Sequence, residues 1–182
     1  MLLLELFGKF GDPRQKEYVT LVRDSGHHLL DVVNSILDVS KIESGAYSIL
    51  PEPFVLADAI EMCRSMMAGQ AEAKSIRLTV SDASSVGEIV ADRRAVQQIL
   101  INLVGNAIKF TETGAVHVEA RFEPHEQGGA LVIDVIDSGI GMTEEQLGRI
   151  FDPFMQADSG TTRTFGGTGL GLSIARRLSR ML

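Results

Sequence analysis

The sequence is poor in cysteine, in basic residues and in long apolar runs, and each shortage excludes a class of protein. Cys63 is the only cysteine among 182 residues, so no internal disulfide can form and no second thiol is available for a zinc site. Its simplest interpretation is a small buried hydrophobic residue. Such cysteine usage fits a chain that folds in a reducing cytoplasm.

Basic residues are outnumbered, because 17 lysines and arginines face 24 aspartates and glutamates, which gives a net charge of −7. A basic face for nucleic acid is therefore not expected, and we predict no nucleic-acid partner. The apolar start, Met1–Phe7, is much shorter than the roughly 20 residues that cross a bilayer and lacks the basic flank of a signal peptide. We predict no membrane contact by this stretch of chain.

Hydrophobic residues make up 45% of the sequence and charged residues 23%, which is typical of a globular protein with a packed core. Its length suits one domain of ordinary size with a helical extension. The sequence FGDPR at 10–14 predicts a turn, with Asp12 capping a helix. That helix should end at Gly45, and ILPEPF at 49–54 then predicts an extended linker. Along the helix, apolar and small residues step by three and four as in a helical bundle: Val19, Val22, Gly26, Leu29, Val33, Ile36 and Ser40.

This pattern divides the chain into a helical extension at 1–48 and a domain at 49–182, and the domain mixes helical and strand periods. We expect a helix near 57–74, strands at 76–80 and 88–91, a helix opening at Asp92, a half-exposed strand at 116–123, a deeper strand at 130–137, and a capping box from Thr143 to Gln146.

The segment NLVGNAIKFT at 102–111 places polar side chains on a helix that is otherwise apolar. Asn102, Asn106 and Lys109 fall on adjacent turns of one face, so two amides and an ammonium project together. Taken alone, they could equally cap loops or lie in water.

The segment DSGIGM begins with Asp137 at the end of the apolar strand 130–137. Strand alternation directs its carboxylate to the same side as Leu131, Ile133 and Val135, into the interior. A buried carboxylate needs a partner, and a ligand amino group would suit, with Gly139 and Gly141 letting the backbone approach a flat ring. A simple turn aspartate is the alternative.

The segment GGTGLGLSIA at 166–175 is a glycine-rich turn that leads into a helix. Such a helix start offers N–H groups and the positive end of the dipole to phosphates. The sequence contains neither GxxxxGK[ST] nor a GxGxxG loop after a strand, so a Walker A site and a dinucleotide fold are excluded. A flexible connector is the alternative for this segment taken alone.

Together, the order and spacing of these segments resemble the ATP site of sensor histidine kinases in the GHKL superfamily, which also holds gyrase and MutL-type ATPases. The four matching segments are the N box at 102–111, the first glycine box at 137–142, the F box at 150–158 and the second glycine box at 166–172. The segment 22–45 resembles the second helix of the dimerisation and phosphotransfer domain. The resemblance covers nearly the whole chain and implies an α+β fold: a two-layer sandwich in which a mixed sheet packs against helices, preceded by a long bundle-type helix.

The resemblance also implies roles for individual residues and two cofactors, ATP and Mg²⁺. Asn106 would coordinate the magnesium, Asn102 would support it, Lys109 would contact the phosphates, and Asp137 would accept a hydrogen bond from the adenine amino group. Other residues expected to bind the nucleotide or hold the lid over it are Phe110, Gly139, Gly141, Phe151, Phe154, Gly167, Thr168, Gly169, Leu170 and Gly171. The stretch 152–166 resembles the family's ATP lid, in which Arg163 would lie near the γ-phosphate, and Thr164 replaces a second basic residue found in many relatives.

Position 102 separates two classes of enzyme within the superfamily. Gyrase-like ATPases carry there a glutamate that activates water, whereas Asn102 cannot act as a general base. The resemblance therefore implies a kinase whose γ-phosphoryl acceptor is a histidine, with relay to the aspartate of a response-regulator receiver domain.

The acceptor histidine is expected before Met1, because no motif resembling HELRTPLNAI occurs and His27 and His28 lie on the second helix. Relatives also continue beyond 173–182 with a hairpin that completes the sheet. The parent is expected to form a homodimer through a four-helix bundle and could be anchored in the bacterial inner membrane. Three alternatives stay open: a degenerate module that recognises a partner, a gyrase-type ATPase, and a serine kinase acting on an anti-sigma partner.

Overall fold

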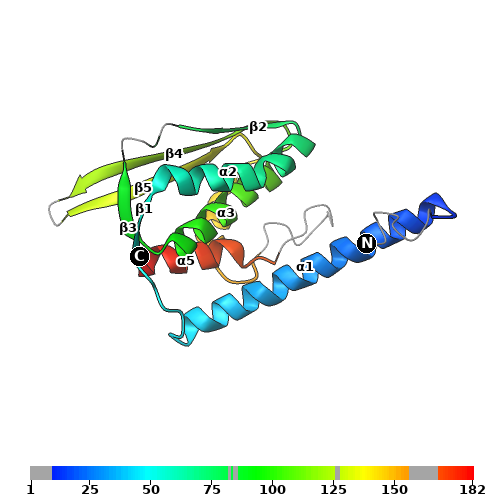
Figure 1. Cartoon of the computed structure of the whole chain (residues 1–182), viewed down its shortest axis with the longest axis horizontal. Helices are drawn as coiled ribbons and strands as arrows, with labels where there is room; N and C mark the ends of the chain where they lie inside the picture. Colours follow the sequence, from blue (N-terminus) through cyan, green and yellow to red (C-terminus); the bar gives the residue numbers. More distant parts are fainter. Residues whose placement is uncertain (1–9, 82, 84–85, 126–127, 156–167) are drawn as a thin grey trace.

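The computed structural model describes residues 10–81, 83, 86–125, 128–155 and 168–182. A long helix precedes a unit of alternating strands and helices (Figure 1). In chain order the elements are α1 (Pro13–Glu43), β1 (Glu52–Val55), α2 (Leu56–Ala73), β2 (Ile76–Val80), β3 (Glu88–Ala91), α3 (Arg93–Phe110), β4 (Gly114–His125), β5 (Gly128–Asp137), α4 (Glu144–Arg149) and α5 (Gly171–Met181).

The main sheet contains three strands in the order β2, β4, β5. Strand β2 pairs parallel with β4, and β4 pairs antiparallel with β5 in a register that sets Val116 opposite Asp137. Strands β1 and β3 form a separate antiparallel pair. A mixed sheet with helices packed on it confirms the expected α+β class.

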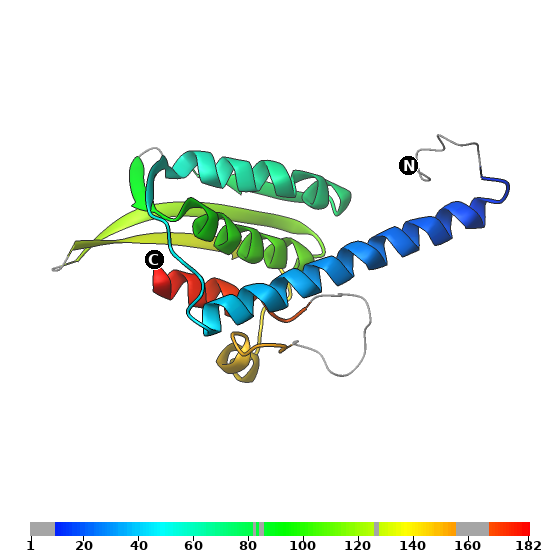
Figure 2. The ribbon, with the colours of Figure 1, turned by 60° about the horizontal axis from the view of Figure 1, so that its bottom comes forward.

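Helices α2 and α3 lie side by side on one side of this sheet (Figures 1 and 2). The apolar residues of α3 recur every three or four positions, so they form one stripe that is buried against α2 and the strands. This shared core includes Ile60 and Cys63 of α2, Leu100 and Val104 of α3, and Val116 of β4. Its burial leaves the opposite, polar face of α3 for other contacts.

Helix α1 begins as predicted, because the Asp12 side chain accepts the Arg14 N–H at 2.8 Å and Pro13 occupies the first turn. It ends just before Gly45, whose φ of +69° suits a helix stop. Its C-terminal end lies beside α5, where Val39 and Ile42 pack against a buried cluster that contains Leu170, Ile174 and Leu178. The rest of α1 extends away from the sheet (Figure 2).

Two expectations were wrong in detail. Strand β5, predicted to lie deeper than β4, has no fully buried residue at 129–137, where its burial is described, whereas Val116 and Val118 of β4 are 0% and 2% exposed. The reason is strand order, since β4 is central and β5 pairs on one side only among the described residues. The predicted linker at 49–54 is extended, but its last residues already belong to β1, which pairs with β3.

Candidate functional site

Helix α3 carries the predicted polar face, and its first turn is fixed by a buried cap. The Asp92 carboxylate accepts N–H groups of Arg94 at 2.9 Å, Ala95 at 3.1 Å and Leu50 at 3.0 Å. Burial would raise the pKa of Asp92, but these hydrogen bonds and the Arg94 guanidinium outweigh it and lower the pKa. The cap therefore joins the segment after α1 to the start of α3.

The polar face of α3 lies against the start of α5. A Cβ atom at Gly171 would lie 3.3 Å from Asn102 Oδ1, so the predicted N box and second glycine box touch in the structure. The Asn102 Nδ2 atom is buried and has no hydrogen-bond partner among the residues that the structure describes, which is costly for an amide nitrogen unless another molecule supplies the acceptor. Asn106, one turn further on, is half-buried.

The last turn of α3 is held by Lys74, at the end of α2. Its Nζ atom donates to the carbonyl oxygens of Ile108 at 2.9 Å, Lys109 at 2.6 Å and Thr111 at 3.2 Å. A cation there also complements the negative end of the helix dipole. Lys74 was not identified from the sequence, although a lysine directly after a helix and before a strand is a possible signal for a cap of a neighbouring helix.

The loop after β5 docks on the same helix end. The Ile140 N–H donates to the Phe110 carbonyl oxygen at 3.3 Å. Gly139 is required there, because a Cβ atom would lie 2.6 Å from Phe110 O and 2.7 Å from Asp137 Oδ1. The predicted first glycine box is therefore brought to the C-terminal end of the predicted N box.

Asp137 differs from its prediction, because its side chain is exposed and not buried. Alternation does set it on the core-facing side of β5, but it is the last residue of the strand and the helices do not cover it. Its Oδ1 atom accepts the Gly139 N–H at 2.8 Å, which fixes the carboxylate at the start of the loop after β5. The carboxylate therefore lies at the protein surface beside the glycine loop.

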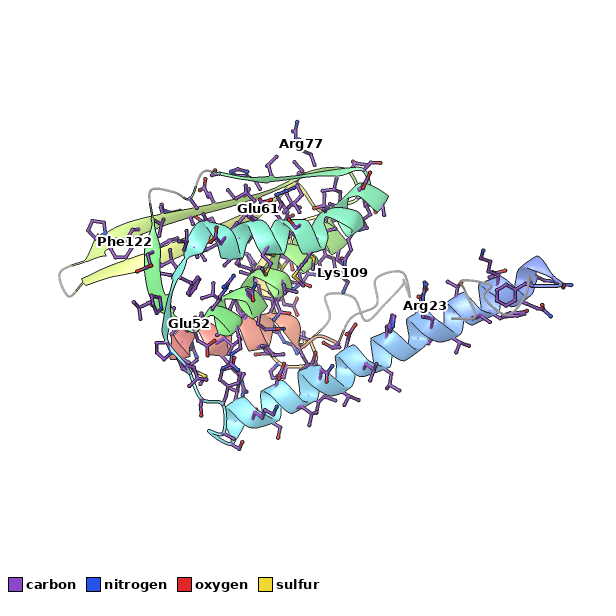
Figure 3. All side chains as sticks on the ribbon, viewed as in Figure 1. Arg23, Glu52, Glu61, Arg77, Lys109 and Phe122 are labelled. Carbon is purple, nitrogen blue, oxygen red and sulfur yellow. The ribbon has the colours of Figure 1, made fainter. Side chains whose placement is uncertain are left out.

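Lys109 and Phe110 lie at the same end of α3, and Figure 3 labels Lys109 there. The Lys109 Nζ atom lies 4.6 Å from the centroid of the Phe110 ring, within the range of a cation–π contact. Partial burial, and then the charge of Lys74, lower the pKa of Lys109. The two lysines thus lie close enough at this end of α3 for the charge of one to affect the other.

The residue that precedes helix α5, Leu170, makes no side-chain cap. The first N–H groups of α5 therefore receive no hydrogen bond from a capping side chain. Gly169 directs the chain into it with a φ of +68°, and a Cβ atom there would lie 2.8 Å from the Phe154 carbonyl carbon. The Leu170 N–H donates to Thr168 Oγ1 at 3.1 Å. The side chain of Leu170 is fully buried, which anchors this turn to the protein.

The two phenylalanines expected to anchor a lid do so differently. The Phe154 side chain is 65% exposed, so it is not packed into the core, and its backbone has a φ of +64°. Its N–H donates to the Gly169 carbonyl oxygen at 3.1 Å. Phe151 is held from α5, where the Arg176 guanidinium lies 5.2 Å from the ring centroid. The contact with Arg176 was not predicted. Arg163, Gly167 and most of the predicted lid, 156–167, lie outside the described residues.

Three segments that are distant in the sequence thus meet around one helix, α3. Its polar face contacts the start of α5, and its end receives the loop after β5. The chemistry fits a nucleotide with its metal: an amide oxygen is a suitable ligand for a hard cation, an uncapped helix start suits phosphates, and a carboxylate beside glycines suits a base.

Comparisons with known proteins agree with this geometry. Residues 91–182 match the family described as "Histidine kinase-, DNA gyrase B-, and HSP90-like ATPase". An uncharacterized sensor-like histidine kinase, R01002 of Rhizobium meliloti, is 51% identical over 97% of this chain and 33% of its own length. The autoinducer 2 sensor kinase/phosphatase LuxQ of Vibrio parahaemolyticus is 40% identical over 92% of this chain and 20% of its own length.

Among solved structures, full-length ShkA in complex with AMPPNP is 34% identical and superposes with a TM-score of 0.79 over 98% of this chain and 36% of its own. The chain belongs to the family of histidine kinase-, DNA gyrase B- and HSP90-like ATPases. Within that family it is an ATP-binding catalytic module of a sensor histidine kinase, and it spans a third or less of the length of the two relatives. No helix in the described part of the chain is long and apolar enough to cross a bilayer.

Proposed function

We propose that the protein containing this chain is a protein-histidine kinase. It transfers the γ-phosphoryl group of Mg-ATP to a histidine outside this chain, and that group then passes to an aspartate of a response-regulator receiver domain. The observation that carries the proposal is the meeting of Asn102 with Gly171, because it sets the N box against the glycine turn that would hold the phosphates.

The nucleotide would lie along the polar face of α3. Asn106 would coordinate Mg²⁺, which neutralises charge on the phosphates, and Asn102 would support it. Lys109 and Arg163 would contact phosphates. At the other end of the site Asp137 would accept a hydrogen bond from the adenine amino group. The remaining contacts would come from the end of α3, the loop after β5, the F box and the glycine-rich turn: Phe110, Gly139, Gly141, Phe151, Phe154, Gly167, Thr168, Gly169, Leu170 and Gly171.

The buried amide of Asn102 supports a kinase over a hydrolase. An amide is not a general base at ordinary pH, and its Oδ1 atom already lies beside Gly171 at the start of α5. A gyrase-type ATPase would release phosphate steadily from the isolated chain, whereas a kinase module would release it only slowly. Measuring phosphate release therefore separates the two proposals.

Helix α1 supports the assignment of residues 1–48 to a dimerisation and phosphotransfer region. Leu29, Leu30, Val33, Ile36 and Leu37 are 44–63% exposed on this helix, and such an apolar surface is ordinarily covered in a helical bundle. We propose a homodimer of the parent protein through this helix. We also propose that the site for ATP lies in the cytoplasm, whether or not the parent is anchored in a membrane.

The proposal is tested by phosphoryl transfer in the full-length protein. With γ-labelled ATP we expect an acid-labile, base-stable label on the protein, and Asn106→Ala should abolish it. Gln97→Ala is a matched control, because Gln97 is on the same helix but its amide donates to Met62 Sδ, toward α2. Labelling that survives Asn106→Ala would remove Asn106 from the metal site, and an absence of label from the wild-type protein would contradict the kinase proposal.

A further inference from the structure

The C-terminal turn of α3 is unusual because each of its last carbonyl groups has a partner from the protein. A helix end leaves its final carbonyl oxygens without partners inside the helix. Here Ala107 O accepts the Thr111 N–H at 3.1 Å, and Phe110 O accepts the Ile140 N–H at 3.3 Å. The carbonyls between them, of Ile108 and Lys109, both accept from Lys74. The helix end is thus shared between Lys74 and the loop after β5.

We propose that Lys74 is a positioning residue for the nucleotide site. It holds the last turn of α3 so that Phe110 O points to Ile140 N–H and the loop of Asp137 and Gly139 is presented to the base. This inference rests on the proposed function, because it assumes that this loop receives the nucleotide.

Geometry distinguishes Lys74 from an ordinary surface lysine. Its Nζ atom has three carbonyl partners within 3.2 Å, all from residues 34 to 37 positions later in the chain. An ammonium group has three donors, which is enough for one hydrogen bond to each of these carbonyl oxygens. The contact of Lys74 also joins α2 to the last turn of α3, which the loop after β5 contacts. That loop fits tightly, since there is no room for a Cβ atom at Gly139.

The charge of Lys74 also affects the pKa of Lys109. The two ammonium groups repel, which contributes to the lowered pKa of Lys109. With an apolar residue at position 74, the pKa of Lys109 should rise. A cap with a purely structural role far from the site would not produce this change.

The experiment compares Lys74→Met with the wild-type chain, using AMP-PNP with Mg²⁺ in calorimetry and amide hydrogen exchange. We expect Lys74→Met to weaken the affinity about tenfold or more, because loss of charged hydrogen bonds releases the turn. Exchange at Ile140 N–H should accelerate, while Leu147 N–H, which donates to Thr143 O at 2.9 Å within α4, should exchange as before. Lys74→Arg should restore most of the affinity.

Lys41→Met is the matched control, since Lys41 is an exposed lysine in the last turn of α1, and it should bind as the wild type does. If Lys74→Met does not fold, Lys74→Gln retains a shorter donor and should show an intermediate loss. Unchanged affinity and unchanged Ile140 exchange in a folded Lys74 variant would overturn the inference alone. A wild-type chain that binds no AMP-PNP would overturn the proposed function itself.

Discussion

Replacement of Gly139 by alanine tests the docking of the loop on α3. The new Cβ atom would lie 2.6 Å from Phe110 O, and because that oxygen belongs to a helix end held by Lys74, the loop and not the helix must move. The Ile140 N–H to Phe110 O distance is already 3.3 Å, close to the limit for a hydrogen bond. A small retreat of the loop therefore breaks it.

The expected loss has a steric part and a hydrogen-bond part. Overpacking typically costs about 1–3 kcal/mol, and a lost hydrogen bond about 0.5–1.5 kcal/mol, so Gly139→Ala should lower the free energy of unfolding by about 1.5–4.5 kcal/mol. The displaced loop carries Asp137, which would contact the base, so nucleotide affinity should also fall. We expect a loss of about tenfold or more, which corresponds to about 1.4 kcal/mol of binding free energy. Urea unfolding measures the first effect, and calorimetry with Mg²⁺ and AMP-PNP measures the second.

The matched control is Gly69→Ala, in the middle of α2, where a Cβ atom meets nothing within 4 Å. It should raise stability by about 0.5–1 kcal/mol, because alanine is the better helix former, and leave affinity unchanged. If Gly139→Ala is as stable as the wild type and binds the nucleotide equally well, the close contact between the loop and α3 is refuted.

Three further predictions concern the supports of the site. Leu170→Ala should destabilise the protein by about 2–5 kcal/mol in urea unfolding, because the side chain is 0% exposed; a loss below 1 kcal/mol would contradict its role as an anchor. Asp92 has a lowered pKa in the folded protein, so its contribution is fully present above the unfolded value near 3.8 and is lost as the pH falls through the folded pKa. Asp92→Ala should therefore cost about 1–2 kcal/mol at pH 7 and flatten the loss of stability below about pH 4, which unfolding curves across pH 2–7 would show; an unchanged acid limb would contradict it. The ion pair of Arg177 with Glu43, at 2.7 Å and partly exposed, should show a coupling below about 1 kcal/mol in a double-mutant cycle, and a larger coupling would mean that α1 and α5 are held by charge more than by the apolar cluster.

Local signals in the sequence were sufficient for most elements. The cap at Asp92, the strands at 76–80 and 88–91 and the capping box from Thr143 to Gln146 are confirmed at the predicted positions. Each of these features depends on neighbouring residues only. A cap accepts N–H groups two or three positions away, and a half-exposed strand alternates apolar and polar residues. The spacing of Asn102 and Asn106 likewise defined one helix face before any tertiary contact was known.

The errors all concern properties that depend on distant parts of the chain. Apolar content alone placed β5 deeper than β4, but depth depends on strand order, and β5 lies at an edge of the described sheet. Asp137 was expected to be buried because strand alternation places it on the core-facing side of β5. Alternation gives the direction of a side chain, but it does not say whether other residues cover that side chain. At the far end of the same hairpin, Phe122 lies on the core side by alternation and yet is 57% exposed (Figure 3). Lys74 was missed because its partners are more than 30 residues away.

The central claim is that Mg-nucleotide binds between the asparagine face of α3 and the start of α5. The most direct measurement replaces Mg²⁺ with paramagnetic Mn²⁺ in the complex with AMP-PNP and records which amide signals of the chain broaden in NMR spectra. We expect strong broadening at Asn106 and Gly171 and none at Gly69. Broadening centred elsewhere, for example at Arg64 and Arg77 on the α2 and β2 side, or no broadening with saturating nucleotide, would contradict it.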